Sequence, residues 1–207
     1  MLHTSLPNVN IDAANLMVAG ESAGGHLVAV TGLLRLTKLP IKILFMQYPA
    51  LDFTSILGGK SVTEEMRMIN LWSEHVPYSE VEDHLHGLEK GKLCTRATFG
   101  TRMRLFAACI QAGKFCDLDK VGERLDPMRA LDHAEPLPPI LLYHSKDDEA
   151  VPWQHTREWA AKLRSLQPDV PLYLTYQRGE HVFDKNDTMA TPWLKEPLEF
   201  VQRYWPA

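Results

Sequence analysis

Length, composition and charge limit the classes of function that the chain can have. It has 207 residues, 45% of them hydrophobic and 23% charged, which is ordinary for a globular protein of one domain or two small ones. The net charge is −4 and no basic cluster occurs, which argues against nucleic acid as a partner. No apolar run reaches the ~20 residues that a membrane-spanning helix needs.

The N-terminus and the cysteines predict a cytoplasmic protein. Residues 1–12 contain no basic segment followed by an apolar stretch, the pattern of a signal peptide. The three cysteines, Cys94, Cys109 and Cys116, are an odd number without a CxxC pair, which favours reduced thiols over disulfides.

Short apolar runs alternate with helical patterns along the chain. Strands are predicted at 15–20, 41–48, 140–144 and 172–177. Helices are predicted at 23–35, 153–166 and 193–204, the first with an apolar face made by Leu27, Val28, Val30 and Leu34. Alternation of this kind is typical of a parallel α/β sheet covered by helices.

The stretch 52–136 interrupts this alternation and contains no clear strand. It has helical patterns at about 62–73, 79–89 and 101–112. We therefore expect a helical cap inserted into a core made of residues 1–51 and 137–207. Its apolar residues either form the cap's own core or line an acyl pocket: Met66, Met68, Ile69, Leu71, Trp72, Leu105, Phe106 and Ile110.

The junction between the first strand and the first helix carries a catalytic motif. Its sequence is Gly20-Glu21-Ser22-Ala23-Gly24, followed by Gly25. G-x-S-x-G between a strand and a helix is typical of a nucleophile elbow, in which the serine occupies a strained turn and the glycines allow close approach of strand and helix. Chance alone would produce the pattern about 0.07 times in a chain of this length, so the strand–turn–helix setting favours the functional interpretation.

A nucleophilic serine needs a base, and the base needs an acidic residue to orient it. Among nine histidines, His181 is the one that directly follows the last predicted strand. Two acids follow the third strand, Asp147 and Asp148. Asp148 is preferred because it begins Asp-x-x-Val-Pro, in which Val-Pro starts the next helix. The order is then serine, acid, histidine, as expected of α/β-hydrolases.

Two other histidines, His84 and His86, raise the question of a metal site in the insertion. His84 and His86 alternate with Glu82 and Asp83 inside the polar insertion. This spacing favours a solvated helix face over metal ligation, so we predict neither a metal nor another cofactor.

The chain resembles the α/β-hydrolase superfamily, and within it the hormone-sensitive-lipase-like carboxylesterases. The likeness rests on Gly20 to Leu27, Gln47 to Asp52, Asp126-Pro127, Asp148 to Pro152 and Gly179 to Phe183. It implies hydrolysis of a small-molecule ester through an acyl-enzyme: Ser22 attacks, His181 transfers the proton, Asp148 orients the imidazole, and the Ala23 N–H donates to the oxyanion. A serine peptidase of the prolyl-oligopeptidase type shares this fold and order, and is the enzymatic alternative.

One departure from the family concerns the oxyanion hole. Such enzymes carry a His-Gly-Gly-Gly loop before the elbow, whereas Gly20 is the first glycine here and the family's early strands are also absent. The first strand is therefore expected to form an exposed edge, capable of self-association. The chain is then interpreted as a fragment of a longer esterase, as one that another chain completes, or as a reduced relative with little or no activity.

Overall fold

The structure, a computed structural model, describes residues 12–52, 74–91, 102–112, 114 and 123–205. The chain divides into two compact units. The core unit comprises Met1–Leu51 and Arg124–Ala207, and the insertion unit comprises Asp52–Glu123.

The core unit is built on a four-stranded parallel sheet in the order β1-β2-β3-β4. The strands are β1 (Leu16–Glu21), β2 (Ile41–Gln47), β3 (Ile140–Ser145) and β4 (Leu172–Gln177). The predicted α/β sheet is confirmed, with strand ends within one residue of the prediction. Within the described part of the chain β1 pairs with β2 alone and forms one edge; self-association through it stays a prediction.

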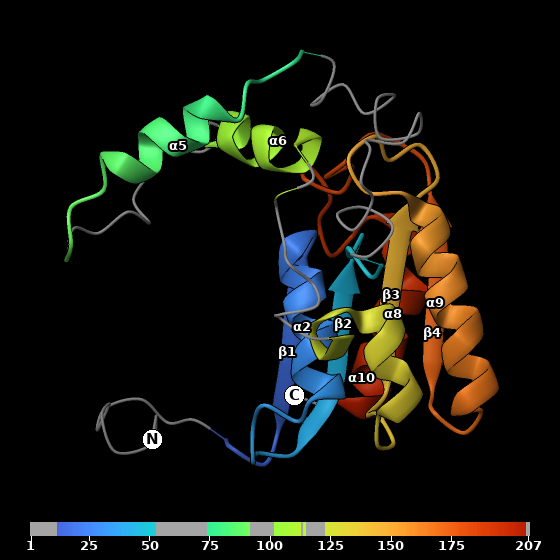
Figure 1. Cartoon of the computed structure of the whole chain (residues 1–207). Helices are drawn as coiled ribbons and strands as arrows, with labels where there is room; N and C mark the ends of the chain where they lie inside the picture. The colour runs from blue at the N-terminus through green and yellow to red at the C-terminus, as the bar shows by residue number, and fades with distance from the viewer. Residues whose placement is uncertain (1–11, 53–73, 92–101, 113, 115–122, 206–207) are drawn as a thin grey trace. The chain divides into compact units, whose positions relative to one another are not determined.

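Helices cover both faces of this sheet (Figure 1). On one face lie α2 (Ala23–Leu33), α8 (Pro127–Ala130) and α9 (Trp153–Leu166); on the other lies α10 (Lys195–Tyr204), which a 3₁₀ turn at Pro192–Leu194 precedes. The first layer encloses the main hydrophobic core: Val28, Ala29, Leu33, Leu44, Met46, Leu51, Ala130, Leu131, Leu137, Ile140, Leu142, Trp159, Ala160 and Leu163. The second layer is more aromatic, as where Tyr173 of β4 packs on Phe200 of α10.

Residues 124–136 belong to the core unit, whereas the sequence placed them in the insertion. They include the end of the 3₁₀ turn Glu123–Leu125, then α8 and a further turn, Leu131–His133. Asp126 caps α8 by accepting from the N–H of Met128 at 2.9 Å, with Pro127 at the first helical position. Trp159 of α9 donates its indole N–H to the Pro127 carbonyl at 3.0 Å. A four-residue helix is too short to show helical periodicity, which explains the misplaced boundary.

The first helix packs through small residues, and the predicted apolar face is wrong at one position. Leu27 is 63% exposed, while Gly25 and Gly32 are buried. A Cβ added at Gly32 would lie 2.5 Å from Leu44 Cδ1 on β2. The helix therefore lies too close to the sheet for side chains at these positions.

The insertion unit contains α5 (Ser79–His86) and α6 (Met103–Gln111). The two helices share a small apolar cluster of Val76, Val81, Ala107 and Ala108, against which Leu105 packs. Glu82, Asp83 and His86 are exposed and His84 is half-buried, so three of these four residues lie on the predicted solvated face. The predicted helix at 62–73, with Met66 to Trp72, lies outside the described residues. The role of this unit as a cap stays a prediction.

Two elbow glycines differ in the space around them, and this difference predicts different costs for adding a methyl group. At Gly20 a Cβ would lie 2.5 Å from the carbonyl oxygen of Gly24, whereas at Gly24 it would meet no heavy atom within 4 Å. We expect Gly20→Ala to lower the free energy of unfolding by about 1–3 kcal/mol. Gly24→Ala, in the first turn of α2, should be neutral or stabilise by roughly 0.5–1 kcal/mol.

Urea unfolding of both variants and the wild type measures this difference. Equal losses in the two variants would contradict the packing argument, because only Gly20 faces backbone atoms at close range.

Candidate active site

Ser22 is the single residue between a strand and a helix. β1 ends at Glu21 and α2 begins at Ala23. Ser22 has φ 51° and ψ −118°, a conformation that costs a non-glycine residue of order 1–3 kcal/mol. Its N–H donates to the carbonyl of Gln47 at 2.9 Å, so the end of β2 holds the turn in place.

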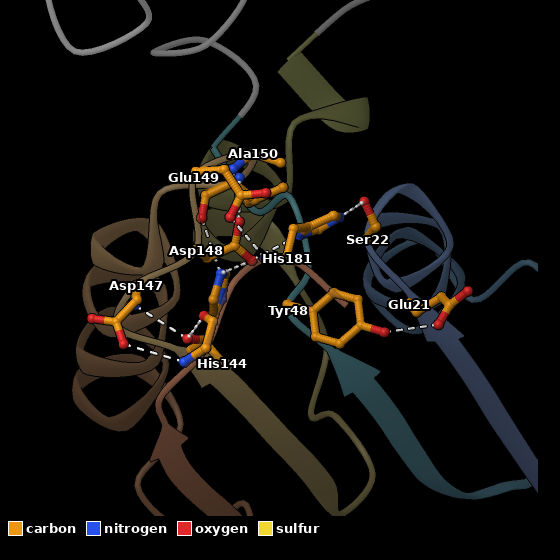
Figure 2. A network of polar contacts seen from close by, with 12 residues as sticks. Glu21, Ser22, Tyr48, His144, Asp147, Asp148, Glu149, Ala150 and His181 are labelled. Carbon is orange, nitrogen blue, oxygen red and sulfur yellow. Dashed lines mark hydrogen bonds and ion pairs between the residues drawn. The ribbon is translucent and has the colours of Figure 1, made fainter. Parts of the chain in front are cut away.

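The structure brings Ser22, His181 and Asp148 into one hydrogen-bonded chain (Figure 2). The Ser22 Oγ lies 3.0 Å from His181 Nε2, and His181 Nδ1 lies 2.8 Å from Asp148 Oδ2. Because a carboxylate only accepts, Nδ1 carries the hydrogen and Nε2 is left to accept from the serine hydroxyl. The three residues follow β1, β4 and β3, whose carboxyl ends meet at one edge of the parallel sheet.

The two neighbouring aspartates have different partners. The Asp148 carboxylate is fully buried and also accepts from the N–H groups of Ala150 at 2.9 Å and Val151 at 2.8 Å. Asp147 instead accepts from Arg178 Nη1 at 2.5 Å and from the N–H of Gly179 at 3.1 Å. It is therefore Asp148 that reaches His181.

A second histidine, which the sequence motifs did not indicate, contacts Asp148. His144, fully buried at the end of β3, places Nε2 3.3 Å from Asp148 Oδ2 and 3.1 Å from the Val151 carbonyl. Both groups are acceptors, so Nε2 carries the hydrogen, and Nδ1 accepts from the Thr156 hydroxyl at 2.7 Å. The available signal was a histidine ending an otherwise apolar buried strand.

These contacts determine the charge state of Asp148. Burial alone would raise the pKa of its carboxyl group, but hydrogen bonds from His144 and His181 outweigh burial and hold that pKa well below the ordinary value. Asp148 is therefore an anion over the whole neutral range, as a group that stabilises an imidazolium must be.

The loop that carries His181 is held by a hydrogen bond from its backbone and contains a strained residue. Glu149 accepts from the backbone N–H of His181 at 2.8 Å, and Val182 has φ 63°. In the described part of the chain four non-glycine residues have positive φ: Ser22, Tyr48 and Val182, which lie at this site, and Arg35. Such strain persists where the surrounding structure enforces it, and it clusters at functional sites.

The elbow also places backbone N–H groups at the start of α2. Ala23 is the first residue of α2, and the first N–H groups of a helix have no acceptor within it. A role of the Ala23 N–H in binding an oxyanion stays a prediction.

Among the described residues no group of three or more His, Cys, Asp or Glu side chains is placed to hold a metal ion, and no helix is long and apolar enough to cross a bilayer.

The lowered pKa of Asp148 predicts how stability depends on pH. Because the folded value lies below the unfolded value of ~3.9, the ionised carboxylate stabilises the fold. That contribution is fully present above the unfolded value and is lost as the pH falls toward the folded one. Asp148→Asn should therefore lose less stability than the wild type between about pH 5 and pH 3. Urea unfolding across this range measures the free energy of unfolding of both proteins as a function of pH. An equal loss in the two proteins would contradict the lowered pKa of Asp148.

Comparisons with known proteins agree with this architecture. Residues 112–206 match the model of the prolyl oligopeptidase family. A probable carboxylesterase M8 from Phoma sp. is 24% identical over 217 residues, covering 99% of this chain and 66% of that protein. Esterase B from Lactobacillus rhamnosis superposes with a TM-score of 0.56 at 13% identity, over 96% of this chain and 54% of that one.

A peptidase shows the same fold similarity. The Pyrococcus horikoshii acylaminoacyl peptidase has a TM-score of 0.56 at 13% identity, over 94% of this chain and 25% of that one. The chain thus spans about two thirds of the carboxylesterase and about half of esterase B. The parallel sheet, the elbow after β1 and these similarities place the chain in the α/β-hydrolase superfamily.

Proposed function

We propose that the chain is a serine hydrolase, namely a carboxylesterase of the hormone-sensitive-lipase-like branch that cleaves small-molecule acyl esters. The observation that carries the proposal is the continuous hydrogen-bonded path from Ser22 Oγ through the imidazole of His181 to the buried carboxylate of Asp148. Such a path activates a hydroxyl group that is otherwise a weak nucleophile at neutral pH.

The geometry supports a two-step reaction. Ser22 Oγ attacks the acyl carbon while His181 Nε2 takes the hydroxyl proton, and Asp148 stabilises the imidazolium that forms. The Ala23 N–H donates to the oxyanion. The tetrahedral intermediate then collapses, and the alcohol leaves with the proton from His181. Water attacks the acyl-enzyme with His181 again as the base, and this releases the acid and restores Ser22.

The elbow sequence and one relative support an ester substrate. Gly-Glu-Ser-Ala-Gly-Gly and Asp126-Pro127 resemble the hormone-sensitive-lipase-like esterases, and the relative aligned over 99% of the chain is named a probable carboxylesterase. The second candidate is a serine peptidase, which the prolyl oligopeptidase family match over residues 112–206 favours.

Replacing the nucleophile should abolish turnover. With p-nitrophenyl butyrate as substrate, we expect Ser22→Ala to lower kcat by at least about 10³-fold. The matched control is Ser165→Ala, which removes an exposed hydroxyl from the last turn of α9 and should keep wild-type activity. Equal turnover by Ser22→Ala and the wild type would contradict the proposal.

A substrate pair separates the two candidate functions. The wild type is assayed with p-nitrophenyl butyrate, which releases p-nitrophenol, and with a peptide p-nitroanilide, which releases p-nitroaniline. The esterase proposal predicts hydrolysis of the ester with a much higher kcat/KM than the anilide. A preference for the anilide that Ser22→Ala abolishes would instead favour the peptidase.

A further inference from the structure

Tyr48 combines three unusual features next to the proposed nucleophile and base. It follows β2 directly, has φ 35° and is completely buried. Positive φ is a marked outlier for a bulky residue, so the surrounding structure enforces it. The backbone N–H of Tyr48 donates to the Tyr143 carbonyl at 2.8 Å, and its ring packs edge-on against the His181 imidazole with centroids 5.0 Å apart.

The Tyr48 hydroxyl lies between two carboxylates. It contacts Glu21 Oε2 at 2.8 Å and Asp184 Oδ1 at 3.0 Å. Glu21 immediately precedes Ser22, and Asp184 follows His181 by three residues. One side chain therefore links the segment that carries the nucleophile to the segment that carries the base. Figure 2 shows Tyr48 between Glu21 and His181.

We propose that Tyr48 is a positioning residue that sets the distance between Ser22 Oγ and His181 Nε2. Its ring limits rotation of the imidazole from one side. Its hydroxyl lies between Glu21 and Asp184, so the elbow at Ser22 and the loop that carries His181 keep a fixed position relative to each other. The inference rests on the proposed function, because the 3.0 Å contact between Ser22 and His181 is the one through which the proton moves.

Burial and two neighbouring carboxylates keep the Tyr48 hydroxyl protonated. Burial, followed by the hydrogen bond to Glu21 and the charge and hydrogen bond of Asp184, raises the pKa of the Tyr48 hydroxyl far above its ordinary range. The group is thus a neutral phenol with a single hydrogen between two acceptors. Phenylalanine at position 48 would remove this donor from both carboxylates; Asp184 would still accept from Tyr143 and from Gln47 Nε2, whereas Glu21 would lose its link to the histidine segment.

Tyr143 provides a matched comparison. It is also buried, and its hydroxyl donates to the same carboxylate, at Asp184 Oδ2, at 2.5 Å. It stands within the regular strand β3, and its hydroxyl also accepts from Gln47 Nε2 at 2.5 Å. Removing either hydroxyl deletes one hydrogen bond to Asp184, but only Tyr48 also reaches Glu21 beside Ser22.

The test compares Tyr48→Phe with Tyr143→Phe by ester turnover and urea unfolding. A displacement of reacting groups by about 1 Å can cost ~10²-fold, so we expect Tyr48→Phe to lower kcat by about 10- to 100-fold with little change in KM. Tyr143→Phe should lose comparable stability with a much smaller loss of kcat. Glu21→Ala should reproduce the Tyr48→Phe loss, and Glu21→Gln, which keeps an acceptor oxygen, should recover most of it.

A second readout does not require turnover. In protein with ¹⁵N-labelled histidine, the Nδ1 proton of His181 should be sharp in the wild type and in Tyr143→Phe, but broadened or lost in Tyr48→Phe. Equal kcat losses in both phenylalanine variants, or an unchanged His181 signal in Tyr48→Phe, would overturn the inference. Absence of any Ser22-dependent turnover together with loss of the His181 signal in Tyr48→Phe would refute the proposed function and leave the positioning role standing.

Discussion

The two hydrogen bonds of the His181 imidazole are the interaction on which the rest of the site depends. They join a serine near the start of the described chain to an aspartate and a histidine more than 120 residues later, with heavy-atom distances of 3.0 and 2.8 Å. Parallel strands make this possible, because the carboxyl ends of β1, β3 and β4 lie on the same edge of the sheet. Each of the three residues stands in the first few positions after its strand.

Further hydrogen bonds hold the groups around the His181 imidazole in place. Asp148 accepts from two histidines and two backbone amides, and Thr156 fixes the tautomer of His144. On the opposite side, Tyr48 joins the elbow to the histidine loop. Strained backbone at Ser22, Tyr48 and Val182 accompanies this arrangement, and regular packing of the core unit supplies the stability that offsets its cost.

Much of this architecture could be predicted from the sequence, for identifiable reasons. The strands are short apolar runs with clear ends, and the elbow is a local motif, so both are visible without tertiary contacts. Asp148 could be preferred over Asp147 only through the Val-Pro that follows it. Tyr48 escaped prediction because its role arises from contacts with residues far away in the sequence, such as Asp184, which lies 136 positions later. The contacts of His144 are local, to Asp148 four positions later and to Thr156 twelve positions later, but a histidine in a buried strand does not by itself show which neighbours it faces. The segment 124–136 was misassigned because α8 has four residues, about one turn.

The most direct test of the central claim locates the nucleophile chemically. The wild type and Asp148→Asn are treated with a fluorophosphonate, digested and analysed by mass spectrometry. The account predicts a phosphonyl adduct on the peptide that contains Ser22, formed at least tenfold more slowly in Asp148→Asn, since loss of the triad acid typically costs ~10⁴ in rate. A folded wild-type chain that is unlabelled at Ser22, or labelled there at the same rate in both proteins, would contradict it.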